Sequence, residues 1–185
     1  MKEERTDEII LALLQTNLDA ERGFRLLMEQ HQEKLYWHVR RMVVAHEDTN
    51  DVIQNTFIKV YRSISTFKGE SKLYTWLFRI ATNEAITFLN QKKKKMTTSI
   101  DDTEQSMAQQ LQADSYFDSD DLELRLQCAI GLLPEKQRIV FNLRYYEEMS
   151  YEEMSGVLDT SVGALKASYH HAAKKIESYF TQKDA

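Results

Sequence analysis

Residues 48–57 read DTNDVIQNTF, and this stretch does most to decide the fold. It is followed by FKGES at residues 67–71 and by TWLFRIATN at residues 75–83. Apolar residues recur at helical spacing in the first and third segments, and the second carries Gly69, which allows a tight turn. These residues therefore predict two amphipathic helices joined by a short loop that offers aromatic and basic side chains.

A second signal lies towards the C-terminus. Residues 133–138 read LPEKQR, residues 150–154 read SYEEM and residues 161–166 read SVGALK. Ser150 and Glu153 form a capping box, which marks the start of a helix. A short helix that begins there would pack on a longer one that follows after a turn. This is the pattern of a helix-turn-helix, and an ordinary helical hairpin shares it.

The composition of the 185-residue chain favours an all-α fold. One proline and five glycines, beside abundant Leu, Glu, Lys and Gln, argue for helices and against a sheet-rich fold. Cys128 is the single cysteine, so neither an intrachain disulfide nor a cysteine-based zinc site is expected. No apolar run approaches the ~20 residues that span a bilayer. The charged start is unlike a signal peptide, and we expect a cytoplasmic protein without membrane insertion.

Charge is unevenly distributed along the chain, whose formal net charge is −5. Residues 59–95 carry nine Lys or Arg and two acids, a net charge of +7. Residues 101–125 carry eight acids and one arginine, a net charge of −7. This segregation indicates a phosphate-facing surface and a separate acidic segment. The acidic whole predicts weak DNA binding by the free protein, so a larger partner would bring it to DNA.

The periodicity predicts two helical domains. Residues 1–95 form the first and residues 122–185 the second, and residues 96–121 are expected to be a flexible acidic linker. Asn17 or Asp19 is expected to cap the second helix of the first domain. Asp48 or Asn50 is expected to cap the third, after a break in the pattern at residues 46–50.

In this order and spacing, the quoted motifs resemble the extracytoplasmic-function (ECF) group of bacterial sigma factors in the sigma-70 family. The resemblance covers residues 7–180 or so. It implies a region 2 helical bundle and a region 4 helix-turn-helix. It also implies an alternative sigma factor that binds RNA polymerase core, recognises −35 and −10 promoter elements and melts DNA. No catalytic residue, metal or cofactor is implied.

The resemblance implies roles for three sets of residues. Core polymerase would dock by its clamp helices on a polar stripe made of Asp48, Asp51, Gln54, Asn55 and Ile58, beside a buried Phe57, Val60 and Tyr61. The −10 strand would be held, by stacking and a basic groove, by Lys59, Arg62, Phe67, Lys68, Gly69, Glu70, Ser71, Lys72, Arg79 and Asn83. The −35 element would be read in the major groove by Ser161, Val162, Gly163, Ala164, Lys166, Ala167, Ser168, His170, His171 and Lys174.

Further partners follow from the same resemblance. Region 4 would contact the polymerase flap, and an anti-sigma factor would cover the polymerase- and DNA-binding faces. The linker would either thread a basic polymerase channel or serve as a soluble tether. His171 stands where the family often has an arginine. His170 and His171 would either titrate near neutrality with a pH-dependent role or be solvated or phosphate-facing imidazoles without a switching role.

Two other classes of protein would account for parts of the sequence. An autonomous helix-turn-helix repressor or activator usually dimerises and would not need the aromatic and basic segment at residues 67–83. An enzyme would need a catalytic constellation. His31, His38 and His46 lack the spacing of a metal motif, and no phosphate loop or nucleophile elbow is present.

Overall fold

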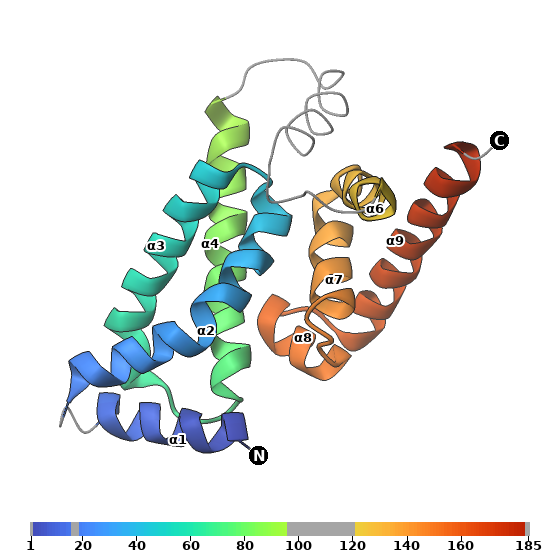
Figure 1. Cartoon of the computed structure of the whole chain (residues 1–185). Coiled ribbons are helices and arrows are strands. Elements are labelled where there is room, and N and C mark those ends of the chain that lie inside the picture. The colour runs from blue at the N-terminus through green and yellow to red at the C-terminus, as the bar shows by residue number, and fades with distance from the viewer. Residues whose placement is uncertain (1, 16–18, 96–120, 184–185) are drawn as a thin grey trace.

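The computed structural model describes residues 2–15, 19–95 and 121–183, and the regular elements in these ranges are all helices (Figure 1). The first group comprises α1 (Lys2–Gln15), α2 (Ala20–Val43), α3 (His46–Ser63), the 3-10 turn η1 (Ile64–Thr66) and α4 (Leu73–Lys95). The second comprises α6 (Asp121–Gly131), α7 (Glu135–Tyr145), α8 (Tyr151–Leu158) and α9 (Val162–Lys183). The all-α prediction is confirmed. None of the helices described is long and apolar enough to cross a membrane.

The cap of α2 is as predicted, and the start of α3 is not. Asp19 accepts a hydrogen bond from the Arg22 backbone N–H at 3.1 Å and so caps α2. Helix α3 already begins at His46, after Ala45, and neither Asp48 nor Asn50 caps it. The reason is a sharp turn at Val44, whose φ of 71° reverses the chain within two residues. Residues 46–50 therefore form the first turn of α3, at the place where a break in the helical pattern was expected.

Helices α2, α3 and α4 pack around one apolar core. Leu35 and Val39 of α2, Val60 of α3, and Leu77 and Phe78 of α4 are fully buried in it. The full set of buried residues recurs every three or four positions along each of these helices, so each helix turns one face inward. Helix α1 adds Ile10 and Leu14.

Tyr61 departs from the prediction that it is buried. Its side chain is 59% exposed, whereas Phe57 and Val60 are buried. Tyr61 lies near the C-terminal end of α3, where its ring meets the edge of Phe24 at a centroid distance of 5.2 Å. One aromatic contact covers only part of a tyrosine, and the rest of the ring faces solvent.

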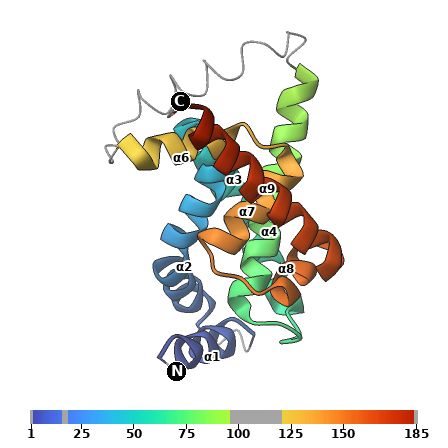
Figure 2. The ribbon, with the colours of Figure 1, turned by 90° about the vertical axis from the view of Figure 1, so that its right-hand side faces the viewer.

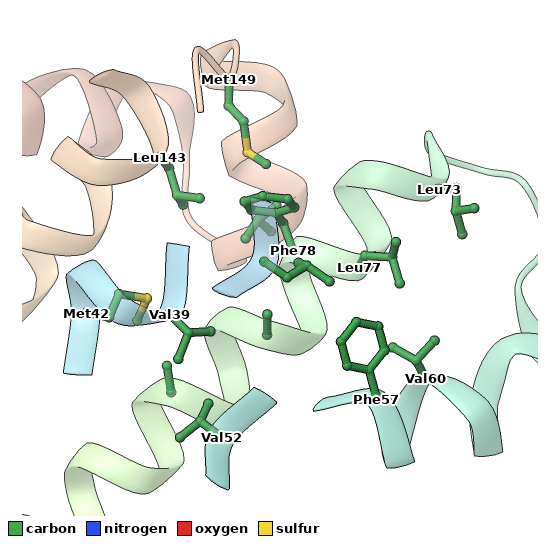
Figure 3. Close-up of a cluster of buried hydrophobic side chains, with 14 of the residues drawn as sticks. Val39, Met42, Val52, Phe57, Val60, Leu73, Leu77, Phe78, Leu143 and Met149 are labelled. Carbon is green, nitrogen blue, oxygen red and sulfur yellow. The ribbon is translucent and has the colours of Figure 1, made fainter. Parts of the chain in front are cut away.

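The second group has a small core of its own and also joins the first. Ala129, Ile130 and Leu133 pack with Phe141 and with residues of α9. In contrast, Leu143 of α7 and Met154 and Val157 of α8 belong to the core of α2, α3 and α4. Helix α8 thus lies against α4, and α7 lies against α2 (Figures 1 and 2). Figure 3 shows Leu143 and Met149 pointing toward Phe78.

The linker prediction concerns residues 96–121. Residues 96–120 lie outside the described residues, and Asp121 is the first residue of α6. The structure does show how the two helical groups are placed relative to each other. They share buried side chains and do not lie apart.

Two glycines offer a matched test of helix packing. A Cβ at Gly23 of α2 would lie 2.9 Å from Leu13 Cβ and 2.9 Å from Leu14 Cγ, whereas a Cβ at Gly156 of α8 would meet nothing within 4 Å. We expect Gly23→Ala to push α1 from α2 and lower the free energy of unfolding by about 1–2 kcal/mol. Gly156→Ala should raise it by about 0.5–1 kcal/mol, because alanine favours the helix. Urea unfolding measures both, and a stabilised Gly23→Ala protein would contradict the close packing.

His38 of α2 is fully buried, with Nε2 2.9 Å from the Thr82 hydroxyl. Burial, with a smaller contribution from the Arg41 charge, lowers its pKa to about 3. The unfolded chain therefore binds a proton below about pH 6.5 that the folded chain does not, and stability falls as the pH falls through that range.

We expect this histidine to remove about 2 kcal/mol of stability between pH 7 and pH 5. Urea unfolding at both pH values should show a smaller loss for His38→Gln than for the parent chain. His170→Gln is the control, because His170 is exposed on α9. Equal pH dependence in the parent chain and in His38→Gln would refute the assignment.

Candidate polymerase and nucleic-acid interfaces

The predicted polymerase stripe lies along one side of α3. Asp51, Gln54, Asn55 and Ile58 are all exposed, because the opposite side of the helix faces the core. Asp48 is half-buried in the first turn, where Lys92 Nζ of α4 lies 2.5 Å from its carboxylate. The stripe therefore presents one free acid, two amides and an apolar side chain.

Tyr61 lengthens this stripe. Ile58 is 42% exposed and Tyr61, three residues further along α3, is 59% exposed. Residues three apart on a helix are neighbours. The stripe thus ends in two adjacent exposed apolar side chains, which is the kind of surface that a protein partner covers. The helical spacing placed Tyr61 in the core and so missed it.

A hollow of about 420 Å³ opens where the loop before α4 meets the helix. It brings together five residues predicted for the −10 strand: Phe67, Lys68, Glu70, Ser71 and Arg79. Its lining is completed by Thr66, Thr75, Trp76 and, from α8, Gly156. Gly69 shapes the loop with a φ of 73°, a conformation that glycine adopts without strain. The predicted tight turn at this glycine is confirmed.

The two aromatic side chains of the hollow form part of its wall and expose little ring surface for stacking. Phe67 is only 7% exposed, and its ring lies 5.4 Å from that of the half-buried Trp76. The exposed side chains around them are Lys68, Glu70 and Arg79. The hollow thus combines a small apolar wall with polar and charged side chains, and its size and basic groups suit one unstacked base and its phosphate.

Five residues predicted for the −10 strand do not line this hollow, and Gly69, in the loop itself, is one of them. Lys59 and Arg62 are exposed on α3, and Asn83 is exposed on α4, one turn beyond Arg79. The Lys59 ammonium pairs with the Glu84 carboxylate of α4. Lys72 lies on the other side of the loop, in a larger groove of about 1090 Å³ along the seam between the two helical groups.

Helices α8 and α9 form the predicted helix-turn-helix. The Ser150 hydroxyl accepts from the Glu153 backbone N–H at 3.2 Å, and the Glu153 carboxylate accepts from the Ser150 backbone N–H at 3.0 Å. This is the predicted capping box. Asp159 then turns the chain with a left-handed φ of 49°. Backbone hydrogen bonding by Ser150 lowers the pKa of Glu153, so the capping carboxylate is ionised at neutral pH.

Helix α9 separates its two faces clearly. Leu165, Ala172 and Ile176 are buried on the side of α9 that packs against α6, α7 and α8, and Tyr169 stacks on Phe141 at 5.6 Å. Eight of the ten residues predicted for the −35 element are exposed: Ser161, Gly163, Ala164, Lys166, Ala167, His170, His171 and Lys174. Val162 and Ser168 are half-buried.

A basic hollow of about 430 Å³ extends this face. It is lined by His171 and Lys174, which were predicted, and by Gln137, Lys175 and Ser178, which were not. Within α9 the lining residues are three or four positions apart, so helical spacing from His171 and Lys174 could have predicted Lys175 and Ser178. Gln137 lies on α7, and only the tertiary structure brings it to α9.

Acidic residues of the second group reach basic residues of the first. Arg41 Nη1 of α2 donates to the Glu147 carboxylate at 3.1 Å, and the Tyr74 hydroxyl of α4 donates to its other oxygen at 3.2 Å. Lys72 Nζ lies 3.2 Å from the Glu153 carboxylate. The Lys93 ammonium pairs with Glu135.

The environment of Glu147 is largely closed to solvent. Its side chain is 8% exposed, and burial raises its pKa although Arg41 and Tyr74 oppose the shift. The Arg41 guanidinium also lies 3.9 Å from the centre of the Tyr146 ring. Burial raises the pKa of Tyr146 to about 12, and its hydroxyl accepts from Gln127 at 2.7 Å.

The three histidines that were weighed as metal ligands have separate surroundings. His31 lies 3.3 Å from Asp7, His38 bonds Thr82, and His46 lies 2.6 Å from the Tyr36 hydroxyl. Within the described ranges, no group of three or more His, Cys, Asp or Glu is placed to hold a metal ion.

The sequence matches the families described as Sigma-70 region 2, over residues 27–95, and Sigma-70 region 4, over residues 123–176. It is 30% identical over 186 residues to the ECF RNA polymerase sigma-E factor of Escherichia coli (strain K12), with 96% of each chain covered. This chain belongs to the ECF sigma factors of the sigma-70 family. The ECF RNA polymerase sigma-E factor of Haemophilus influenzae is 32% identical to this sigma factor over 188 residues, with 96% of this chain and 97% of that one covered.

Solved structures share the fold of this sigma factor. CnrH in complex with the cytosolic domain of CnrY has a TM-score of 0.70 at 22% identity, covering 97% of this chain and 99% of that one. RpoE from Bartonella quintana, in complex with the anti-sigma factor NepR, has a TM-score of 0.68 at 18% identity, covering 85% and 96%. As a member of its family, the chain is an alternative sigma factor that directs transcription initiation.

Proposed function

We propose that this sigma factor uses three separate surfaces in initiation. The stripe on α3 docks on the clamp helices of core RNA polymerase. The hollow before α4 takes an unstacked base of the −10 element. The exposed face of α9 enters the major groove at the −35 element, while the second helical group contacts the polymerase flap. No catalytic step is assigned to the chain, which would act in the cytoplasm beside the polymerase.

The observation that carries the proposal is the recess of about 420 Å³ before α4. A helix-turn-helix occurs in many DNA-binding proteins that read only duplex DNA. A recess with Phe67 and Trp76 in its wall and with Lys68, Glu70 and Arg79 exposed around it favours a further role, because single strands are held by base stacking together with phosphate contacts. Both features in one chain favour promoter opening over the role of an autonomous repressor.

On the −35 side, Lys166 and Lys174 are the exposed cations predicted on α9. The basic hollow adds Lys175, and we propose that it holds a DNA phosphate beside the groove. The side chains of Ser161 and Ala167 are small, so the helix can approach the base edges closely.

We also infer a protein inhibitor. Two similar sigma factors were solved as complexes, one of them with the anti-sigma factor NepR. An inhibitor of this chain would have to cover the exposed stripe on α3 or the −10 hollow, because these carry the proposed polymerase and DNA contacts.

The polymerase stripe is tested by the double change Asp51→Ala, Gln54→Ala. Both side chains are exposed, so we expect the fold to persist and affinity for core polymerase to fall by at least about 10-fold, a loss of about 1.4 kcal/mol. Glu29→Ala, Gln32→Ala is the matched control, since it also removes one carboxylate and one amide, at the same spacing, from exposed positions of α2. Titration of labelled sigma factor with core enzyme gives both affinities. Equal affinities for the two double variants would remove the stripe from the interface.

The −35 face is tested through the salt dependence of promoter binding by the assembled holoenzyme. Each phosphate contact adds about −0.9 to the slope of log K against log salt, so Lys166→Ala, Lys174→Ala should flatten that slope by about 2. Arg22→Ala, Arg25→Ala, on the exposed side of α2, should leave it unchanged. A slope that is unaltered in the α9 variant would contradict the assignment.

A further inference from the structure

Helix α4 carries a polar stripe that leads away from the −10 recess. Arg79 lines the recess, and four exposed residues follow it on the same side of the helix: Asn83, Thr87, Asn90 and Lys94. Successive members of this set are three or four positions apart, so they are neighbours along one face of α4. These five residues are called the α4 stripe below.

The α4 stripe runs beyond the apolar core. Ala85 is the last buried residue of α4, and none of residues 86–94 is buried. In Figures 1 and 2 the C-terminal end of α4 projects past the ends of α2 and α3. A helix with its side chains is about 10–12 Å wide, and the major groove of B-DNA is about 12 Å wide. This end of α4 therefore has the width and the exposure that entry into a major groove requires.

The charges on the α4 stripe suit a polyanion. Glu84 is the single acid among the 23 residues of α4, and it lies beside the stripe, where its carboxylate pairs with Lys59 of α3. The exposed face of an ordinary helix mixes charges of both signs. The stripe instead has Arg79 near one end, Lys94 at the other and no carboxylate between them. A phosphate backbone is the ligand that such a surface attracts.

The three central residues of the stripe are poor helix formers. Asn83, Thr87 and Asn90 occupy exposed positions, where packing does not decide the residue type and strong helix formers are expected. The Thr87 hydroxyl donates to the Asn83 backbone carbonyl at 2.7 Å, a bond that competes with the helix. Residues that break a local preference without a packing reason are typical of functional surfaces.

These side chains match the major-groove edges of A·T base pairs. The NH2 group of an asparagine amide donates to N7 of adenine, and its oxygen accepts from the N6 amino group. A threonine methyl group contacts the C5-methyl group of thymine. Because the Thr87 hydroxyl is bonded to the backbone, its methyl group is the part that remains for a base. Lysine and arginine hold the phosphates that border the groove.

The spacing of the two amides fits base pairs of a duplex. Asn83 and Asn90 are seven residues apart, which is about 10.5 Å along an α-helix. Base pairs are stacked about 3.4 Å apart, so the two amides lie about three base pairs apart when the helix follows the groove. The recess at one end of the stripe would hold an unpaired base. The other end then lies over the duplex that borders the melted segment.

We propose that Asn90, with Thr87 and Lys94, reads a short duplex element upstream of the −10 element, and that the base contacted by Asn90 is adenine. The proposal rests on the proposed function, since it takes the recess before α4 as the −10 site. It extends DNA recognition beyond Asn83 by about two turns of α4.

The element is tested by selection from promoter-length duplexes of randomised sequence. Holoenzyme is assembled from core RNA polymerase and the parent chain, Asn90→Asp or Gln32→Glu, and the bound DNA is sequenced. Gln32→Glu is the matched control, because it also turns an exposed amide into a carboxylate, on α2. Permanganate reactivity of unpaired thymines locates the melted −10 element in the selected DNA.

We expect the parent holoenzyme to enrich adenine by at least about 5-fold at one position two to four base pairs upstream of the melted segment. Asn90→Asp should replace adenine by cytosine there, because a carboxylate accepts from the cytosine N4 amino group. Gln32→Glu should keep adenine, and all three proteins should select the same −10 element. A change of preferred base is an effect that loss of stability cannot produce.

The same selection separates failure of this proposal from failure of the −10 assignment. A −10 element whose upstream neighbours are indifferent to base, or are the same for the parent and Asn90→Asp, would refute base reading by Asn90 and leave the −10 assignment intact. If no protein selects a melted element, both assignments are refuted.

Discussion

Burial of Phe78 joins the two halves of this protein. The ring is fully buried, at 4.8 Å from the ring of His38 and 4.2 Å from that of Tyr74, and Leu143 and Met149 point toward it from the second helical group (Figure 3). Burying one large apolar side chain contributes about 1.5–3 kcal/mol, and several meet here. Helix α4 is therefore covered by α2 and α3 and by α8, and the loop that forms the −10 recess leads directly into it.

This arrangement resolves the apparent conflict between charge and function. A net charge of −5 is unfavourable for a DNA-binding protein, and the basic segment before residue 95 is where phosphates would bind. Arg41, Lys72 and Lys93 are paired with carboxylates of α7, of α8 and of the segment between them. The acids that make the chain acidic thus cover part of its own basic surface.

Local signals in the sequence predicted local structure well. Asp19, Ser150 and Glu153 cap helices as expected, since capping needs only residues three or four apart. Five residues predicted for the −10 strand line the recess before α4, because four of them lie within residues 67–71 and Arg79 lies on the helix that follows. The basic hollow was predicted only in part, because Gln137 comes from another helix. The start of α3 was missed because a valine at positive φ makes its turn, which no propensity favours.

The sequence by itself determined the helical content, the helix-turn-helix, the segregation of charge and the family, since each depends on residue type and short spacing. The tertiary structure decided what the buried faces pack against. The spacing of Met154 and Val157 shows that one face of α8 is apolar, and it is equally consistent with burial against α9 alone or against α4 as well. Only the summed contacts among distant segments select between these arrangements. The partners of Glu147 and Glu153 follow from that selection, because ion pairs form between whatever side chains the packing brings within about 4 Å.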